Sequence, residues 1–171
     1  VARAIGTVSG SNEVAVPVAA ASPLAGLRLL VVEDNPLNQE VVRELLTAAG
    51  AEVEVANDGY QGVEAVSVAA LQFDAILMDI QMPGMDGYEA TRILREERGV
   101  TKPIIAMTAN ALPSDRVACL AAGMNDHIGK PIDMALLVGT LLKHCGRAGV
   151  GGTQHPQQEE AWAGVEPDGF E

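Results

Sequence analysis

The sequence LMDIQMPGMDG, residues 77–87, decides the fold of this chain. Residues 73–78 are mostly apolar and predict a short buried strand that ends at Asp79. The proline and glycines that follow stop a strand and open a turn, and Asp86 can cap a new helix with Glu89 as its capping partner. A carboxylate is therefore expected at the carboxyl end of a buried strand, where ligands bind in parallel α/β sheets. Asp79 is our candidate reactive residue.

Strand and helix patterns alternate along the central part of the chain. Residues 27–32 form a nearly continuous apolar run, as expected for a strand buried on both faces, and residues 52–56 alternate as in an edge strand. Further strands are predicted at 73–78, 103–107 and 125–128, and a helical pattern follows each strand. Five such units predict an α/β fold, a doubly wound five-stranded parallel sheet with helices on both faces. Of the two common strand orders, 2-1-3-4-5 suits five strands.

The spacing of apolar residues predicts which helix faces pack against the sheet. In the first helix the predicted inner face comprises Leu37, Val41, Val42, Leu45, Leu46 and Ala49. In the third helix the predicted inward residues are Ile93 and Leu94, and the predicted outward residues are Arg92, Arg95, Glu96 and Glu97.

Composition divides the chain into three parts. Residues 1–24 predict a flexible linker, residues 25–146 a folded domain, and residues 147–171 a disordered acidic tail. The net charge of −12 argues against a nucleic-acid partner, because clustered Lys and Arg bind a phosphate backbone. No apolar run approaches the roughly 20 residues of a membrane span, and no secretory signal is visible. The two isolated cysteines agree with a cytoplasmic location.

The predicted strand order brings three carboxylates together. Strands one and three are neighbours in this order, so Glu33 and Asp34 after the first strand should meet Asp79 after the third. Carboxylates this close raise one another's pKa unless a cation holds them. Oxygen ligands with few protein contacts suit Mg²⁺, and the backbone carbonyl of Gln81 is a candidate further ligand.

Two further groups are expected at the same edge. Thr108 ends the fourth strand and Lys130 follows the fifth, so a hydroxyl and an ammonium face the same crevice. A carboxylate nucleophile with a divalent cation, a lysine and a hydroxyl suits formation of an aspartyl phosphate. Taken singly, each of these residues also suits an ordinary cap, turn or surface position. Their convergence at four strand ends favours a site.

Residues 25–146 closely resemble the receiver domain of two-component response regulators. The matching segments are VVEDN at 31–35, MDIQMP at 78–83, DG at 86–87, MTA at 107–109 and KP at 130–131. The resemblance implies that Asp79 accepts a phosphoryl group from a phosphohistidine, and that Glu33 and Asp34 help to hold Mg²⁺. It also implies that Lys130 contacts the phosphate, that Thr108 reports its arrival, and that the Lys130–Pro131 peptide is cis.

The resemblance is closest to receivers attached to hybrid sensor kinases, on the segments EDNPLNQ at 33–39, MPGMDG at 82–87 and TANA at 108–111. It implies a histidine kinase domain or a histidine phosphotransfer protein as partner. It further implies that the isolated domain is no enzyme beyond its own phosphorylation and slow dephosphorylation, which Gln81 and Asn110 at the rim would tune.

One position departs from the family pattern. His127 stands where receivers usually have Tyr or Phe, a residue that swings inward as Thr108 moves. A histidine titrates near neutrality, so the switch could depend on pH. The alternative is that His127 simply packs.

Three other functions remain to be weighed. A phosphatase of the haloacid-dehalogenase type needs a second acid two residues after the nucleophile, and that position is Gln81. A degenerate receiver that only binds proteins would require the loss of a key group. A flavodoxin-like nucleotide-binding protein would require a Gly-rich phosphate loop after the first strand.

Overall fold

The computed structural model describes residues 22–69 and 72–146 of the 171-residue chain. Its five strands form one parallel sheet in the order β2-β1-β3-β4-β5, which confirms the predicted topology. In chain order the elements are β1 (Arg28–Val32), α1 (Pro36–Ala48), β2 (Glu52–Ala56), α2 (Gly59–Ala69), β3 (Ala75–Asp79), α3 (Gly87–Arg92), the π-helix η3 (Ile93–Glu97), β4 (Ile104–Thr108), α4 (Pro113–Ala122), β5 (Asp126–Gly129) and α5 (Met134–Cys145). None of the described helices is long and apolar enough to cross a membrane.

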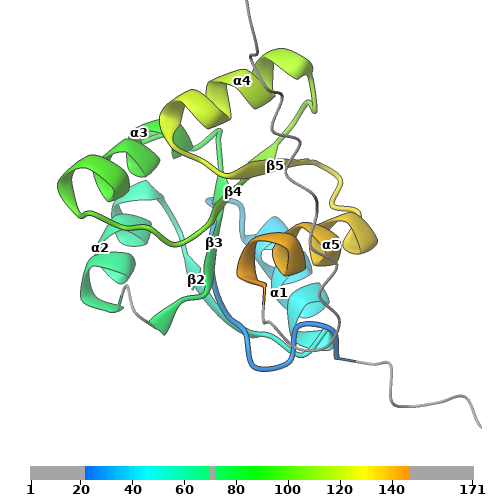
Figure 1. Cartoon of the computed structure of the whole chain (residues 1–171). Coiled ribbons are helices and arrows are strands. Elements are labelled where there is room, and N and C mark those ends of the chain that lie inside the picture. The colour runs from blue at the N-terminus through cyan, green and yellow to red at the C-terminus, as the bar shows by residue number, and fades with distance from the viewer. Residues whose placement is uncertain (1–21, 70–71, 147–171) are drawn as a thin grey trace, which may run out of the picture.

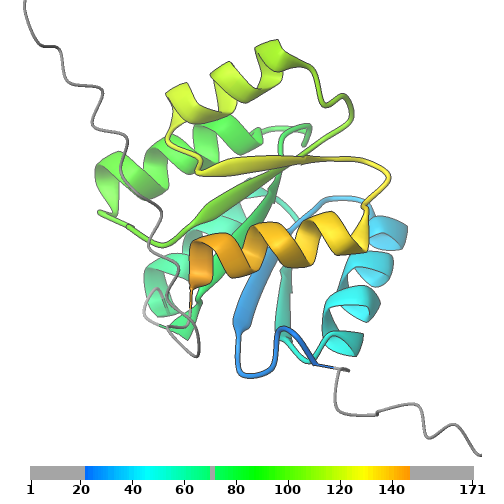
Figure 2. The same cartoon turned by 45° about the vertical axis from the view of Figure 1, so that its right-hand side comes forward.

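Helices cover both faces of the sheet. Figures 1 and 2 show α1 and α5 on one face and α2, α3 and α4 on the other. Successive residues of β3 point to opposite faces: Ile76 and Met78 join the core under α2 and α3, whereas Ala75 and Leu77 join the core under α1 and α5. Every residue of β3 is buried. This two-sided burial is why the strand is a continuous apolar run.

Side-chain caps fix where the helices begin, close to the sheet edge. The Asn35 side chain accepts hydrogen bonds from the N–H groups of Leu37 and Asn38, at 2.9 and 3.3 Å. Asp86 accepts from the N–H of Glu89 at 2.8 Å, as the sequence predicted. Because each cap satisfies an N–H group that the helix cannot, α1 and α3 start directly after the loops that follow β1 and β3.

The predicted inner face of α1 is only partly correct. Val42 and Leu46 are buried, but Leu37 is 69% exposed and Val41 is 46% exposed. Leu37 belongs to the first turn of α1, beyond the last residue of β1, so no strand lies beneath it. Two apolar side chains therefore remain on the surface near the carboxyl edge of the sheet.

The outward placement predicted for Arg95 is wrong. Its guanidinium donates to the carbonyls of Gly123, Val100 and Lys102 at 2.7–2.8 Å, and to the Asn125 side chain at 2.7 Å. Arg95 lies in η3, the π-helical end of the third helix, and the following chain turns back within reach of its side chain. A helical projection that assumes regular α geometry cannot place this residue correctly.

The last position of the predicted linker packs against the folded part. Leu24 is fully buried, and its N–H donates to the carbonyl of Ala49 at 2.9 Å. The rest of the predicted linker, residues 1–21, and the predicted acidic tail, residues 147–171, lie outside the described residues.

Candidate functional site

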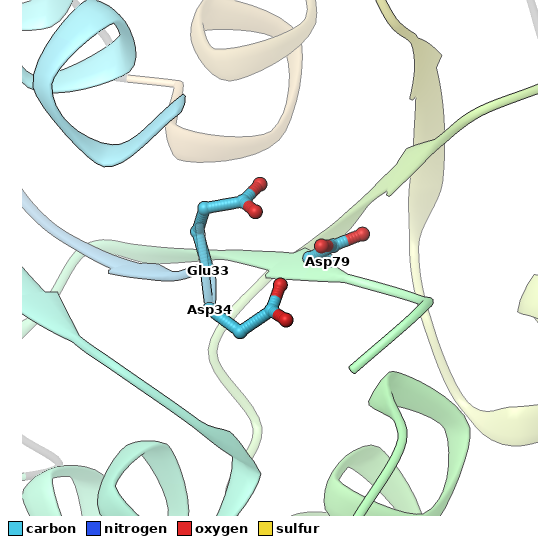
Figure 3. A group of neighbouring side chains, drawn as sticks. All are labelled: Glu33, Asp34 and Asp79. Atoms are coloured by element: carbon cyan, nitrogen blue, oxygen red, sulfur yellow. The ribbon is translucent and has the colours of Figure 1, made fainter. Parts of the chain in front are cut away.

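The three predicted carboxylates meet at the carboxyl edge of the sheet. Glu33 and Asp34 directly follow β1, and Asp79 is the last residue of β3, which pairs with β1. Figure 3 shows the three side chains gathered at the adjoining ends of the two strands. Carboxylate oxygens of the three residues lie within 4.8 Å of one another. Glu33 and Asp79 are buried, and Asp34 is partly exposed.

Gly87 explains how α3 can begin so close to Asp79. A Cβ atom at Gly87 would lie 2.3 Å from the carbonyl oxygen of Asp79, which is impossible without moving the backbone. The N–H of Gly87 donates to the carbonyl of Ile80 at 3.0 Å. The hydrogen bond between Gly87 and Ile80 closes the loop that follows Asp79 into a tight turn. Only glycine fits at position 87, where this turn ends.

Lys130 lies between two of the carboxylates. Its Nζ atom is 2.8 Å from Oε2 of Glu33 and 3.2 Å from Oδ2 of Asp79. The backbone N–H of Lys130 donates to the carbonyl of Thr108 at 2.7 Å, which holds the loop after β5 beside β4. The Lys130–Pro131 peptide is cis. The predicted convergence of an ammonium with the carboxylates is confirmed.

Burial and crowding shift the pKa values of these groups. Burial, followed by the charge of Glu33, raises the pKa of Asp79 to about 6, although Lys130 and the N–H of Gln81 act against the shift. Burial also acts to raise the pKa of Glu33, but hydrogen bonds from Lys130 and Asn35 outweigh it, and the pKa is lowered. Burial acts to lower the pKa of Lys130, yet its two carboxylate partners raise it.

The donor set fits a divalent cation. Among the described residues, one ammonium pairs with two of the three carboxylates and none pairs with the third, so the ionised cluster carries an excess of negative charge. Grouped carboxylate oxygens that are open to water on one side are the ligands that Mg²⁺ prefers. Glu33, Asp34 and Asp79 are the residues that would hold such an ion.

Thr108 and the rim residues lie on the α4 side of the site. The Thr108 hydroxyl donates to the carbonyl of Asn110 at 2.9 Å, and the N–H of Gln81 donates to Oδ1 of Asp79 at 3.2 Å. A small cavity of about 50 Å³ is lined by Gln81, Thr108, Asn110 and Tyr88, among others. Tyr88 was missed from the sequence, because its contact with the loop after β4 depends on how α3 packs against α4.

His127 lies away from the carboxylates, on the outer strand β5. Its side chain lines a groove of about 460 Å³ together with Ala111, Leu136 and Lys143. The ring is 18% exposed, and its buried Nδ1 atom has no hydrogen-bond partner among the described residues. No hydrogen bond or ion pair in the described structure joins His127 to Thr108 directly.

Fold and site together define a class: a doubly wound α/β domain with a buried aspartate, acidic neighbours, a lysine and a threonine at one sheet edge. The sequence profile of the response regulator receiver domain matches residues 29–142, and the chain belongs to this family.

Similar proteins with curated descriptions are sensor proteins and histidine kinases, which agrees with membership of the receiver-domain family. The sensor protein GacS of Pseudomonas syringae pv. syringae is 43% identical over 125 residues, which cover 71% of this chain and 14% of that protein. The chain therefore spans only a small part of this curated relative. Similar curated proteins include further histidine kinases from bacteria, plants and yeast.

Two solved structures carry the comparison to three dimensions. The receiver domain of the sensor histidine kinase PA1611 from Pseudomonas aeruginosa PAO1 has a magnesium ion in its active site cleft. It is 47% identical, with a TM-score of 0.64, over 72% of this chain and 100% of that one. The receiver domain of Ssk1 from Saccharomyces cerevisiae, solved with the histidine phosphotransfer protein Ypd1, is 26% identical. Its TM-score is also 0.64, over 69% of this chain and 88% of that one.

Proposed function

We propose that this domain takes a phosphoryl group from a partner's phosphohistidine onto Asp79 and passes the signal, or the phosphate, to another protein. One observation carries the proposal: the buried Asp79 carboxylate lies among Glu33, Asp34 and the Nζ atom of Lys130, at the edge where β1 and β3 meet. All five groups that such a receiver needs, including the Thr108 hydroxyl, are present at strand ends.

The chemistry is an in-line displacement at phosphorus. A carboxylate oxygen of Asp79 attacks, a new oxygen–phosphorus bond forms, and the phosphorus–nitrogen bond breaks with its electron pair remaining on the partner's imidazole. Lys130 stabilises the charge on the phosphoryl oxygens. Glu33, Asp34, Asp79 and the backbone carbonyl of Gln81 would hold Mg²⁺, which when bound would supply positive charge to offset the crowded carboxylates.

The same geometry suggests how phosphorylation is reported. The Thr108 hydroxyl now donates to the carbonyl of Asn110. A phosphoryl group on Asp79 offers a charged acceptor, and moving the hydroxyl to it would release the loop between β4 and α4. His127 lies on the neighbouring strand and would adjust with this loop. If it takes part, the change on phosphorylation should differ between about pH 5.5 and 8.

Water ends the phosphorylated state by hydrolysing the acyl phosphate. Gln81, two residues after Asp79, and Asn110 line the same small cavity and are expected to set this rate. The isolated domain would then act on no substrate besides its own aspartate. A phosphatase of the haloacid-dehalogenase type uses an acidic residue two positions after its nucleophile. In this chain that position is Gln81, which argues against such a phosphatase.

The proposed partner is a histidine phosphotransfer protein or a histidine kinase domain in the cytoplasm. The exposed Val41 of α1 lines an apolar groove of about 180 Å³ together with Lys130, Pro131 and Ile132, among others, and Leu37 is exposed one turn earlier in the same helix. A helix that docks there would present its histidine directly to Lys130 and Asp79. The yeast Ssk1 receiver was solved with a phosphotransfer protein of this kind.

Intact-mass spectrometry with a small phosphodonor and Mg²⁺ tests the proposal. The wild type should gain one phosphate, and Asp79→Asn should gain none. Asp58→Asn is the matched control, because Asp58 caps α2 and asparagine caps equally well. An unphosphorylated wild type, or equal uptake by Asp79→Asn, would rule the proposal out and favour a domain that only binds proteins.

A further inference from the structure

Asp34 differs from the two other carboxylates in how it is held. Glu33 accepts hydrogen bonds from Lys130, Asn38 and the N–H of Asn35, and Asp79 contacts Lys130 and the N–H of Gln81. No hydrogen bond or ion pair holds the Asp34 carboxylate within residues 22–69 and 72–146. Figure 3 nevertheless shows it directed toward the space beside Asp79. Its own backbone must therefore set its position.

That backbone is anchored by a side chain from α1. The Nε2 atom of Gln39 donates to the carbonyl oxygen of Glu33 at 2.6 Å. Because the peptide group is planar, a fixed Glu33 carbonyl also fixes the N and Cα atoms at which Asp34 begins. The N–H of Glu33, on its other side, donates to the carbonyl of Ala56 at 3.1 Å. The residue before Asp34 is thus held from both sides.

The Gln39 carboxamide is itself held in place. An amide nitrogen carries two hydrogens, and Nε2 of Gln39 also donates to Oδ1 of Asn57 at 3.0 Å. The Asn57 side chain and backbone N–H both donate to Oε1 of Gln61, at 2.9 and 3.1 Å. A chain of amides therefore runs from α2 through the loop after β2 to the loop that carries Asp34.

We propose that Gln39 is a positioning residue for the cation: it directs the Asp34 carboxylate through the Glu33 carbonyl, and Asn57 keeps it in that role. The inference rests on the proposed function, because it assumes that Mg²⁺ binds at this edge. Groups that orient metal ligands without touching the metal commonly change affinity when they are removed. Here the anchored group is the peptide bond before the ligand.

A shape-conserving variant tests this role. Gln39→Met keeps the length of the side chain and removes its donor. We expect the dissociation constant for Mg²⁺, measured by isothermal titration, to rise about 10-fold, at the lower end of the range for such positioning groups. Thr47→Met is the matched control, since Thr47 is an exposed residue near the far end of the same helix, and it should bind Mg²⁺ like the wild type.

A double-mutant cycle separates positioning from a general loss of structure. Asn57→Ala should weaken Mg²⁺ binding by about 3-fold. Added to Gln39→Met it should weaken binding no further, because both act through one chain of hydrogen bonds. Saturating Mg²⁺ should restore phosphorylation of Gln39→Met to the wild-type rate. A lasting deficit would mean that Gln39 acts otherwise.

The outcomes distinguish this inference from the proposed function. If the wild type binds no Mg²⁺, the function proposed for the site is wrong. If the wild type binds Mg²⁺ and Gln39→Met binds it equally well, only the positioning role is wrong. Independent, additive effects of Gln39→Met and Asn57→Ala would also overturn the role assigned to the amide chain.

Discussion

Two groups of charged side chains lie at opposite ends of the sheet, and they are built in opposite ways. At the carboxyl edge Glu33, Asp34 and Asp79 lie together, and among the described residues one ammonium, that of Lys130, pairs with Glu33 and Asp79 and leaves Asp34 without an ion pair. At the start of β5 the ratio of carboxylates to positive or donor groups is reversed. There a single carboxylate, Asp126, contacts His144, Lys143 and the N–H of His127.

The pKa values record this difference. Burial acts to raise the pKa of Asp126, but the hydrogen bond from His144, the N–H of His127 and the charge of Lys143 lower it overall. Burial and Glu33 instead raise the pKa of Asp79. The cluster at Asp126, whose charges are balanced, joins α5 to β5. The cluster at Asp79 has more carboxylates than positive charges among the described residues, so it could hold a cation. Excess charge at one place in a stable fold therefore marks the site.

The largest effect on stability should come from removing the ammonium of Lys130, the one positive charge in the cluster of Glu33, Asp34 and Asp79 among the described residues. Lys130→Met leaves Glu33 and Asp79 buried without a counter-charge, so we expect the free energy of unfolding to fall by about 3 kcal/mol without Mg²⁺. Lys143→Met at the other cluster is the matched control. Its side chain is 68% exposed, and the loss of its ammonium should cost well under about 1 kcal/mol. Urea unfolding followed by circular dichroism measures both, and equal losses would contradict the comparison.

Removing the carboxylate of the balanced cluster should destabilise the fold. Asp126→Asn weakens a charged hydrogen bond from His144, at a cost of about 2 kcal/mol near neutral pH. Because the folded-state pKa of Asp126 lies below its ordinary value of 3.8, this contribution is complete above about pH 4 and disappears as the pH falls further. Urea unfolding at several pH values checks this. A difference between wild type and variant that persists at low pH would show that charge is not its source.

Asp79 should show the opposite pH dependence in the absence of Mg²⁺. Its folded-state pKa of about 6 exceeds the ordinary 3.8, so between these values the folded state binds a proton that the unfolded state does not. The stability of the wild type relative to Asp79→Asn should therefore fall as the pH rises from about 4 to 6, on the order of 1–2 kcal/mol. Thermal unfolding of both proteins across this range tests the sign. Saturating Mg²⁺ should remove the dependence.

The smallest effect concerns the two histidines near Asp126. His127→Phe removes a buried ring nitrogen that has no hydrogen-bond partner among the described residues and lies 3.9 Å from Oδ1 of Asp126, and should stabilise the fold by about 0.5–1 kcal/mol. His144→Phe breaks the 2.9 Å hydrogen bond to Asp126 and should destabilise it. The same substitution thus gives opposite signs in urea unfolding. Destabilisation by His127→Phe would mean that the 3.9 Å contact of its ring with Asp126 outweighs the missing hydrogen bond.

Most of the architecture followed from local pattern. The strands around Val32 and Asp79 were predictable because a strand buried on both faces must be a continuous apolar run. Asn35 and Asp86 marked helix starts because only a few side chains satisfy the first N–H groups. The convergence of Glu33 and Asp79 then required no more than the strand order.

Other features depended on contacts between distant segments. Arg95 faces backbone carbonyls because η3 departs from α geometry, and Leu37 is exposed because no strand extends beneath it. Gln39 looked like an ordinary polar position of α1, since its partner Asn57 is 18 residues away. Periodicity describes one element at a time and therefore carries no information on such pairs.

The sequence by itself determined the β-α order and the residues that occupy each strand end, because both follow from hydrophobic period and turn chemistry. Only the tertiary structure decided how those residues share charge. Lys130 and Glu33 are separated by 97 positions, yet their side chains meet at 2.8 Å. The packing of the whole sheet sets this distance. The same packing places Asp79 beside Glu33, Asp34 and Lys130, so Asp79 is a crowded carboxylate and not an ordinary turn residue.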